Sequence, residues 1–229
     1  MSWRDYWNAD TPIYVNDRHK TLHYAGIARD IAAYLPGPDA VVLDHGCGEA
    51  LSADRVAARC ARLYLCDGAP LVRGRLAARF AAEPRISVLA PEEVGQLPEH
   101  GLDLVVVNSV LQYLPTEELD ELLGLWHSKL REDGRLVLAD VIPHETNPLD
   151  DVSALLRFAW SGGFLGAALL GLARTALSDY ARLRQELGLT HYGEEEMLAL
   201  LEGRGFKGER AARNMGHNQK RMTFVARMA

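Results

Sequence analysis

The sequence predicts an α/β protein with a doubly wound, mostly parallel sheet that an antiparallel pair of C-terminal strands closes. Three observations lead to this prediction. Short apolar runs alternate with helical stretches between residues 41 and 139, as a parallel sheet covered on both faces requires. The first of these runs ends in a glycine-rich turn that opens a helix. Two more apolar runs, 206–213 and 222–227, close the chain with only the polar segment 214–221 between them.

The elements follow one another in four parts of a single domain, 1–229. The N-terminal arm, 1–38, contains a helix from Thr21 to Leu35, which ends before Pro36 because proline cannot continue it. The core, 40–142, alternates strands with helices, and we expect them at 41–43, 51–60, 63–66, 70–82, 86–89, 104–107, 117–130 and 136–139. A mostly helical insertion covers 145–190. The last part, 191–229, contains a helix at 194–202 and the final strand pair.

Length, charge and cysteine content narrow the class of protein. The chain has 229 residues, of which 48% are hydrophobic and 24% charged, as in a soluble globular domain. Its net charge of −6 argues against a nucleic-acid partner. Three cysteines cannot all pair, so we expect no disulfide scaffold and a reducing, cytoplasmic location. The N-terminus carries charges and aromatic residues where a signal peptide would have an apolar run.

The glycine-rich turn, Asp44-His45-Gly46-Cys47-Gly48, is the strongest motif. Gly46 and Gly48 permit a tight turn and let a ligand approach the backbone, and the following helix offers unpaired N–H donors. Leu51 stands where the nicotinamide dinucleotide fingerprint has its third glycine, which disfavours that cofactor. The carboxylate of Asp44 would repel a pyrophosphate and suits a positively charged ligand.

A second carboxylate, Asp67, ends the run 63–66, 23 residues after Asp44. At the end of the second strand of a βαβ unit, a carboxylate can accept hydrogen bonds from both hydroxyls of a ribose. The alternative is a turn or capping residue before Pro70.

These motifs, together with Leu102–Pro115 and Asp133–Asp140, resemble those of the class I S-adenosylmethionine-dependent methyltransferases. The resemblance covers residues 40–142, and the C-terminal strand pair agrees with it. It implies a Rossmann-like, seven-stranded sheet and S-adenosylmethionine as the cofactor. The cofactor contacts that it implies are Asp44, Gly46, Cys47, Gly48, Asp67, Gly68, Asn108 and Gln112.

By the same resemblance, Asp44, Gly46 and Gly48 line the methionine part of the cofactor, and Asp67 holds the ribose. Asn108 and Gln112 would lie near the transferable methyl or the carboxylate.

The chain departs from the family at the adenine contact. The family often has an acidic residue just after the third strand, where this chain has Ala90. The adenine contact must therefore come from backbone groups or from Glu92.

The histidines are the candidates for acid–base chemistry. His19 and His23 are four residues apart and share one face of a helix, close in sequence to Tyr14 and Tyr24. His144 follows the fifth strand, at the edge where this fold places ligands. We expect His19, His23 and His144 to be catalytic candidates, with surface or capping roles as the alternative. A metal would also need His217 or Asp140, but no compact ligand spacing exists, so we expect none.

The insertion contains sixteen consecutive uncharged residues, 158–173, which is too short for a span of about twenty. Gly162-Gly163 should split it into two helices. We expect a lid that packs over the carboxyl ends of the strands and lines the acceptor pocket with Phe158, Trp160 and Phe164. The alternatives are a peripheral membrane contact through 152–174, with Arg157 and Arg174 near headgroups, or a dimer interface.

The segment 214–221 is long and polar for a connection between two strands. It is either a solvated turn or a substrate-binding loop that uses Asn214, His217, Asn218 and Arg221. Tyr14, Tyr113 and His217 complete the residues expected at the substrate.

The function expected is methyl transfer from S-adenosylmethionine to a small-molecule or lipid-like acceptor by in-line displacement, by a monomer or homodimer. Such a displacement needs mainly alignment and exclusion of water. A non-catalytic module that binds S-adenosylmethionine and a Rossmann-type NAD oxidoreductase are the alternatives.

Overall fold

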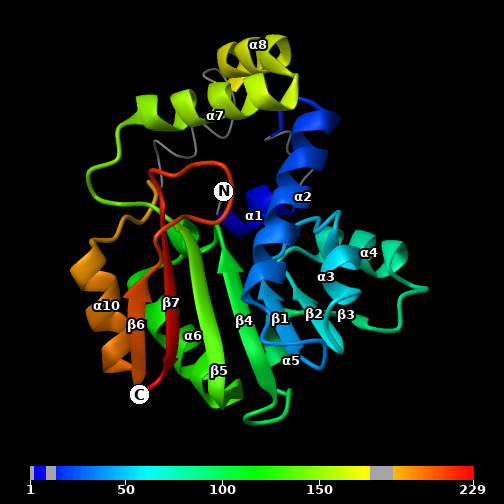
Figure 1. Cartoon of the computed structure of the whole chain (residues 1–229), viewed down its shortest axis with the longest axis vertical. Coiled ribbons are helices and arrows are strands. Elements are labelled where there is room, and N and C mark those ends of the chain that lie inside the picture. Colours follow the sequence, from blue (N-terminus) through cyan, green and yellow to red (C-terminus); the bar gives the residue numbers. More distant parts are fainter. Residues whose placement is uncertain (1–2, 9–13, 176–187) are drawn as a thin grey trace.

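The computed structural model describes residues 3–8, 14–175 and 188–229, and its centre is a seven-stranded sheet (Figure 1). The strand order is β3-β2-β1-β4-β5-β7-β6. The parallel strands are β1 (Val41–His45), β2 (Arg62–Cys66), β3 (Ile86–Leu89), β4 (Leu102–Asn108) and β5 (Leu130–Val141). Strand β7 (Met222–Met228) pairs antiparallel with β5 and with β6 (Phe206–Arg210). The predicted fold class is confirmed.

Helices cover both faces of the sheet. One face carries α2 (Asp17–Tyr34), α3 (Ala53–Ala57) and α4 (Pro70–Arg79). The other carries α5 (Pro91–Val94), α6 (Thr116–Lys129) and α10 (Glu194–Gly203). Successive residues of β4 alternate between the two apolar cores, with Val106 in the first and Val105 in the second. Every residue of this strand's centre is therefore buried, which explains its continuous apolar run.

Several element boundaries differ from the prediction. Helix α2 begins at Asp17, four residues earlier than expected, because the side chain of Asn16 accepts a hydrogen bond from the backbone N–H of His19 (2.8 Å) and caps the helix. Strand β5 begins at Leu130 rather than at residue 136. Leu130, expected at the end of the helix 117–130, pairs instead with Leu102, and the exposed residues 131–133 follow it across an irregularity in the register.

The expected insertion, 145–190, is described except for residues 176–187, which lie outside the described residues. Its described part contains two helices, α7 (Pro148–Gly162) and α8 (Leu165–Thr175), and we call the segment 148–175 the lid. The lid lies beyond the carboxyl ends of the parallel strands, at the top of Figure 1. Gly163 separates the helices with a left-handed φ of 71°, so the predicted break is confirmed. On the inner side, Ala159, Phe164 and Ala168 are buried and pack against Leu22 of α2.

None of the helices in the described parts of the chain is long and apolar enough to cross a membrane.

The left-handed conformation of Gly163 yields a stability prediction. Gly163→Ala should lower the free energy of unfolding by about 1–2 kcal/mol, because a Cβ atom is strained at this φ. Gly166→Ala, on α8, is the matched control, since its Cβ would meet nothing within 4 Å. That variant should be neutral or slightly more stable. Thermal denaturation measures both, and equal melting temperatures would show that the break does not depend on Gly163.

Candidate functional site

The glycine-rich turn after β1 is tightly enclosed. Gly46 and Gly48 have left-handed φ values of 79° and 58°. A Cβ atom on Gly46 would collide with the side chain of Val110, and one on Gly48 would lie 2.8 Å from the hydroxyl oxygen of Tyr24. The backbone N–H of Glu49 donates to the same hydroxyl (3.0 Å). Tyr24 of α2 thus closes over the turn from the N-terminal arm.

Asp67 connects the turn after β1 to the turn after β2. Its carboxylate accepts hydrogen bonds from the backbone N–H of Gly48 (2.9 Å) and from that of Ala69 (2.8 Å). Asp67 therefore acts as a turn residue, which was one of the two alternatives. Each of its oxygens keeps a second lone pair, so the other alternative, binding of the hydroxyls of a ribose, is compatible with this role. Gly68, between the two bonded positions, has open space where a Cβ would lie.

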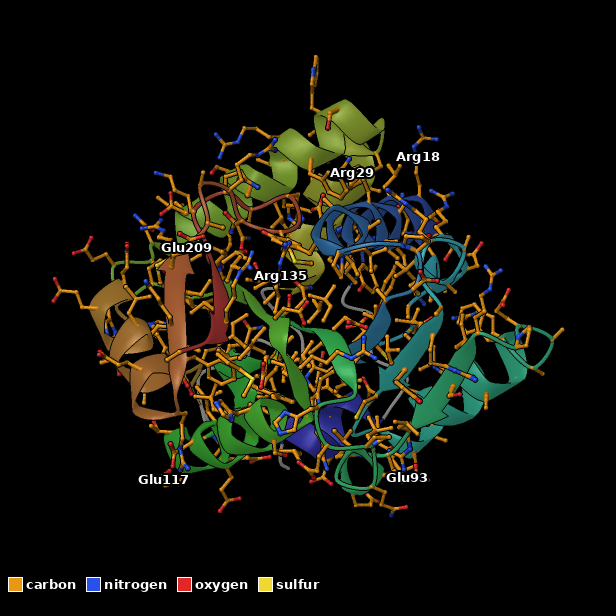
Figure 2. The ribbon with its side chains drawn as sticks, turned by 60° about the horizontal axis from the view of Figure 1, so that its bottom comes forward. Arg18, Arg29, Glu93, Glu117, Arg135 and Glu209 are labelled. Carbon is orange, nitrogen blue, oxygen red and sulfur yellow. The ribbon has the colours of Figure 1, made fainter. Side chains whose placement is uncertain are left out.

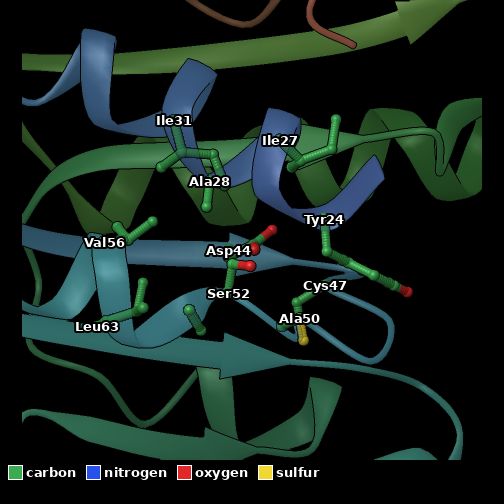
Figure 3. A pocket seen from close by; sticks show the side chains of 11 residues that line it. Tyr24, Ile27, Ala28, Ile31, Asp44, Cys47, Ala50, Ser52, Val56 and Leu63 are labelled. Atoms are coloured by element: carbon green, nitrogen blue, oxygen red, sulfur yellow. The ribbon is translucent and has the colours of Figure 1, made fainter. Parts of the chain in front are cut away.

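Asp44 lies buried beside this pair of turns. Burial, together with the negative charge of Asp67, raises the pKa of Asp44 from 3.8 to about 7. Burial also raises the pKa of Asp67, and the hydrogen bonds that it accepts from the N–H groups of Ala69 and Gly48 partly offset this rise. Figure 3 shows Asp44, Cys47 and Tyr24 around a cavity of about 20 Å³, which has room for about one water molecule.

The neighbouring strands β4 and β5 both end in strained residues. Ser109 and Asp140 have φ values of 59° and 60°, a left-handed conformation that residues with a side chain seldom adopt. The hydroxyl of Ser109 donates to Asp140 (2.7 Å) and accepts a hydrogen bond from the amide of Asn108 (3.2 Å). The amide oxygen of Asn108 is buried and has no hydrogen-bond partner. It is an acceptor available to a ligand at the end of β4.

The loop 214–221, which lies between β6 and β7 in the sequence, is hydrogen-bonded both to β5 and to the lid. Asn214 accepts from the backbone N–H of Asp140 (3.1 Å), and Asn218 donates to Asp151 of α7 (2.8 Å). One nitrogen of Arg221, Nη2, donates to both carboxylate oxygens of Asp151 (2.8 and 2.9 Å). Asn214, Asn218 and Arg221 are all buried, so the alternative of a solvated turn is wrong.

Three histidines and two phenylalanines meet beneath the lid, and we call this group the histidine–aromatic cluster. His19 and His23 come from α2, His217 from the loop, and Phe158 and Phe164 from the lid. The ring of Phe158 stacks on His217 with centroids 4.7 Å apart, and that of Phe164 stacks on His19 at 5.1 Å. The centroid of His217 lies 6.4 Å from that of His19 and 6.3 Å from that of His23.

Tyr14 borders the cluster, with its ring centroid 5.3 Å from that of His19 and 5.5 Å from that of His23. The five expected residues His19, His23, His217, Phe158 and Phe164 are thus together, and Tyr14 is beside them.

The cluster histidines are neutral near pH 7. Burial, together with the proximity of His217, lowers the pKa of His19 to about 4. Burial, together with the proximity of His217 and His19, lowers the pKa of His23 to about 3. Burial also lowers the pKa of His217, but the negative charges of Asp140 and Asp151 oppose this effect. A neutral imidazole can accept a proton, and only His217 has nearby carboxylates that would stabilise the resulting imidazolium. Among the described residues, no group of three or more His, Cys, Asp or Glu side chains is arranged to hold a metal ion.

Other expected residues lie elsewhere. The side chain of His144 is 58% exposed, and its Nε2 lies 2.9 Å from a carboxylate oxygen of Glu196 on α10. His144 therefore makes a surface contact and does not join the cluster. The prediction that Trp160 lines the pocket is wrong, because its side chain is 77% exposed on the outer side of α7. Glu92 is exposed on α5, close enough to Cys66 to affect the pKa of its thiol. The backbone carbonyl of Gln112 accepts from the N–H of Thr190 (2.9 Å).

A short N-terminal helix, α1 (Trp3–Trp7), contributes contacts that the sequence analysis missed. The ring centroids of Trp3 and Trp7 lie 4.8 and 5.5 Å from that of Tyr113, which follows β4. Asn8 accepts from the backbone N–H of Leu71, at the start of α4 (3.1 Å). Helix α1 therefore bridges the ends of β2 and β4. The indole N–H of Trp7 is buried without a hydrogen-bond partner. The aromatic residues of the N-terminus were the only signal for this role.

The chain is similar in sequence to known proteins. Residues 42–134 match the family described as "Methyltransferase domain". The chain is 31% identical over 200 residues to a carboxy-S-adenosyl-L-methionine synthase of Dichelobacter nodosus (strain VCS1703A), which covers 81% of this chain and 79% of that protein.

Solved structures share the fold. One is magnesium protoporphyrin IX methyltransferase (ChlM) from Synechocystis PCC 6803 with bound SAM, with a TM-score of 0.61 and 18% identity over 99% of this chain and 95% of that one. Another is the pyocyanin biosynthetic protein PhzM, with a TM-score of 0.61 and 17% identity. That match covers 100% of this chain but 62% of PhzM, so the chain spans less than two thirds of its length. At these identities the likeness is one of fold.

The raised pKa of Asp44 predicts a pH-dependent stability. Because the folded pKa of about 7 exceeds the unfolded value, protonated Asp44 favours folding below about pH 4, and this contribution is lost as the pH rises through 7. Asp44→Asn should therefore raise the melting temperature at pH 8 by about 2–4 °C, the shift for about 1 kcal/mol in a domain of this size. The difference should vanish at pH 4.

The matched control is Asp133→Asn, which changes an exposed carboxylate on β5 and should leave the melting temperature unchanged at both pH values. A destabilised Asp44→Asn variant at pH 8 would show that the Asp44 carboxylate has a stabilising partner.

Proposed function

Because the chain belongs to the S-adenosylmethionine-dependent methyltransferase family, we propose that it transfers a methyl group from S-adenosylmethionine to a small, largely apolar acceptor by in-line displacement. The observation that carries this proposal is the histidine–aromatic cluster, which places neutral imidazoles and apolar rings together, with His217 near Asp140 at the end of β5. When bound, S-adenosylmethionine supplies an electrophilic methyl group on a positively charged sulfur.

The residues at the carboxyl ends of the strands fit this cofactor. Asp67 would accept the ribose hydroxyls with its remaining lone pairs, and the backbone at Gly46 and Gly48 would face the methionine part. Two buried polar atoms without partners, the amide oxygen of Asn108 and the indole N–H of Trp7, would each find one in the cofactor. The cavity beside the turn is small, so Tyr24 and α2 would move to admit a ligand of this size.

The charge at the turn also fits. Asp44 and Asp67 lie close together and repel each other, which raises the pKa of Asp44. A positively charged ligand beside them would favour the ionised carboxylates. NAD carries a negatively charged pyrophosphate, which the carboxylates of Asp44 and Asp67 would repel. The charge at the turn therefore argues against an NAD-dependent oxidoreductase.

His217 is the residue that we assign as general base. A nucleophilic oxygen or nitrogen of the acceptor that carries a proton must lose it during transfer. His217 is neutral, stacks on Phe158 and has Asp140 and Asp151 near enough to stabilise its charged form. Phe158 and Phe164 would hold an apolar acceptor and exclude water. The acceptor is thus a small-molecule or lipid-like compound with an ionisable O–H or N–H group.

The synthase from Dichelobacter nodosus is named for a carboxylated form of S-adenosylmethionine. A chain with that activity would change the cofactor itself rather than an acceptor. Mass spectrometry of the cofactor after incubation distinguishes the two outcomes, because methyl transfer leaves S-adenosylhomocysteine and carboxylation adds mass to S-adenosylmethionine.

The base assignment predicts the effect of His217→Asn. Removal of a general base should lower the rate of methyl transfer by about 10²–10⁴-fold. The affinity for S-adenosylhomocysteine should stay within about threefold, because the stacked Phe158 and the turn after β1 remain. Transfer of labelled methyl groups to a solvent extract of the cells that produce the protein measures the rate, and calorimetry measures the affinity.

His144→Asn is the control, since His144 lies outside the cluster, and its rate should match that of the wild type. A His217→Asn variant with the wild-type rate would remove His217 from the mechanism.

The buried indole N–H of Trp7 predicts a contribution to cofactor binding. Trp7→Phe keeps an aromatic ring against Tyr113 but removes the donor, so the affinity for S-adenosylhomocysteine should fall by about 3–10-fold, the effect of one hydrogen bond. Trp3→Phe, on the same helix and against the same Tyr113, is the matched control. In a thermal-shift assay, S-adenosylhomocysteine should raise the melting temperature of the wild type and NAD should not. Equal affinities for both variants would place Trp7 outside the site.

A further inference from the structure

Large apolar side chains are exposed mainly on the lid. In the described part of the chain, the large hydrophobic residues with the highest exposure are Leu149, Trp160, Leu169 and Leu170 on the lid and Leu71 on α4. Trp160 is 77% exposed and the two adjacent leucines of α8 are 56% and 54% exposed. The lid forms the outermost layer at the carboxyl ends of the strands (Figure 1). Four of these five side chains are therefore concentrated on one layer, whereas isolated exposed residues would be scattered.

These side chains are not needed for packing against the protein. The inner side of the lid already buries Ala159, Phe164 and Ala168. The lid is thus apolar on both its inner and its outer side, and an apolar outer side indicates an environment other than water.

Arginines border this surface, whereas the acidic residues of α7, Asp150 and Asp151, lie in its first turn. Residues 152–178 contain no Asp or Glu, and the charged residues among them are Arg157 and Arg174. Arg157 is exposed on α7, and Arg18 of α2 is exposed beside Gly163 at the break between the lid helices (Figure 2). The chain as a whole has a net charge of −6, so this edge differs in sign from the average surface.

We propose that the outer surface of the lid, formed by Trp160, Leu169 and Leu170 with Arg18 and Arg157 at its edge, contacts membranes that contain anionic lipids. Tryptophan prefers the level of the lipid headgroups, leucine the apolar layer beneath it, and arginine the headgroup phosphates. Three apolar side chains and two arginines give a reversible peripheral contact. No described helix is able to span the bilayer, in agreement with a surface contact.

The proposal has a consequence for the acceptor that rests on the proposed function. Phe158 of α7 and Phe164, in the break between α7 and α8, line the histidine–aromatic cluster from the lid that carries the outer surface. A lid at a membrane surface would place the cluster next to apolar molecules dissolved in the bilayer. The membrane contact itself requires neither cofactor nor methyl transfer.

Flotation of the full-length protein with lipid vesicles tests the contact. Wild-type protein should float with vesicles of phosphatidylcholine and phosphatidylglycerol, float less with phosphatidylcholine alone, and be released at high salt. The triple variant Trp160→Ala, Leu169→Ala, Leu170→Ala should lose at least tenfold in bound fraction. Leu71→Ala removes an apolar side chain of 52% exposure outside the lid and should float like the wild type. Because all four side chains are exposed, each variant should keep the wild-type melting temperature.

A second measurement uses tryptophan fluorescence. Lipids brominated near the headgroup should quench the wild type, and Trp160→Phe should remove most of this quenching. Of the other three tryptophans, Trp126 is fully buried, and Trp3 and Trp7 pack against Tyr113 rather than lying on the lid. Wild-type protein that stays at the bottom of the gradient with anionic vesicles, or a triple variant that floats like the wild type, would overturn the proposal. So would a wild-type dimer that the triple variant converts to a monomer, since a second copy would then cover this surface.

None of these measurements involves S-adenosylmethionine, so a failed flotation leaves the proposed methyl transfer standing. Loss of methyl transfer in His217→Asn, conversely, leaves the membrane contact standing.

Discussion

The bonds from Asp67 to the backbone of two turns are the interaction on which the site most depends. By accepting from Gly48 and Ala69, one carboxylate sets the positions of the chain after β1 and after β2. The same arrangement brings a second carboxylate, Asp44, into a buried position next to it, where the ionised form is disfavoured. The protein thus keeps two acidic groups together at an electrostatic cost that a cationic ligand would relieve. The cost itself is a physical reason to expect a positively charged ligand there.

A second network connects the sheet to the lid. Hydrogen bonds run from Asp140, at the end of β5, to Asn214, and from Asn214 to Asn218 within loop 214–221. Asn218 then donates to Asp151 of α7. His217 lies within this loop, so its position depends on both the sheet and the lid. Arg221 neutralises Asp151 through one nitrogen, while two others remain buried without partners. Such a network is rigid when every member is satisfied. The two nitrogens of Arg221 without partners are therefore the least satisfied part of the network.

Most of the fold could be predicted from the sequence because its signals are local. Buried parallel strands such as β4 read as continuous apolar runs, and the glycine pair after β1 announces a turn. The start of β5 could not be predicted, because Leu130 continues the periodicity of the preceding helix and residues 131–133 are polar. The pairing of Leu130 with Leu102 is what makes this segment part of a strand. The same holds for the site. The turn residues and His19 with His23 were predicted because they share a motif or a helix face. The role of Trp7 and the separation of His144 from the cluster depend on tertiary contacts that no spacing encodes.

Which side of the lid helices faces the protein was the hardest feature to predict from the sequence. Periodicity identifies the inward side of a helix only when the other side is polar, and the lid helices are apolar on both. When both sides are apolar, side-chain size decides which side packs against α2. The residues that face α2 include Ala159 and Ala168, whose small side chains let the helices approach Leu22 closely, while Phe164 fills the space above His19. Trp160 adjoins Ala159 in sequence and, on a helix, cannot point the same way. With the inner side occupied by small residues, the tryptophan is directed outward, which turns a presumed pocket residue into the most exposed large apolar side chain of the lid.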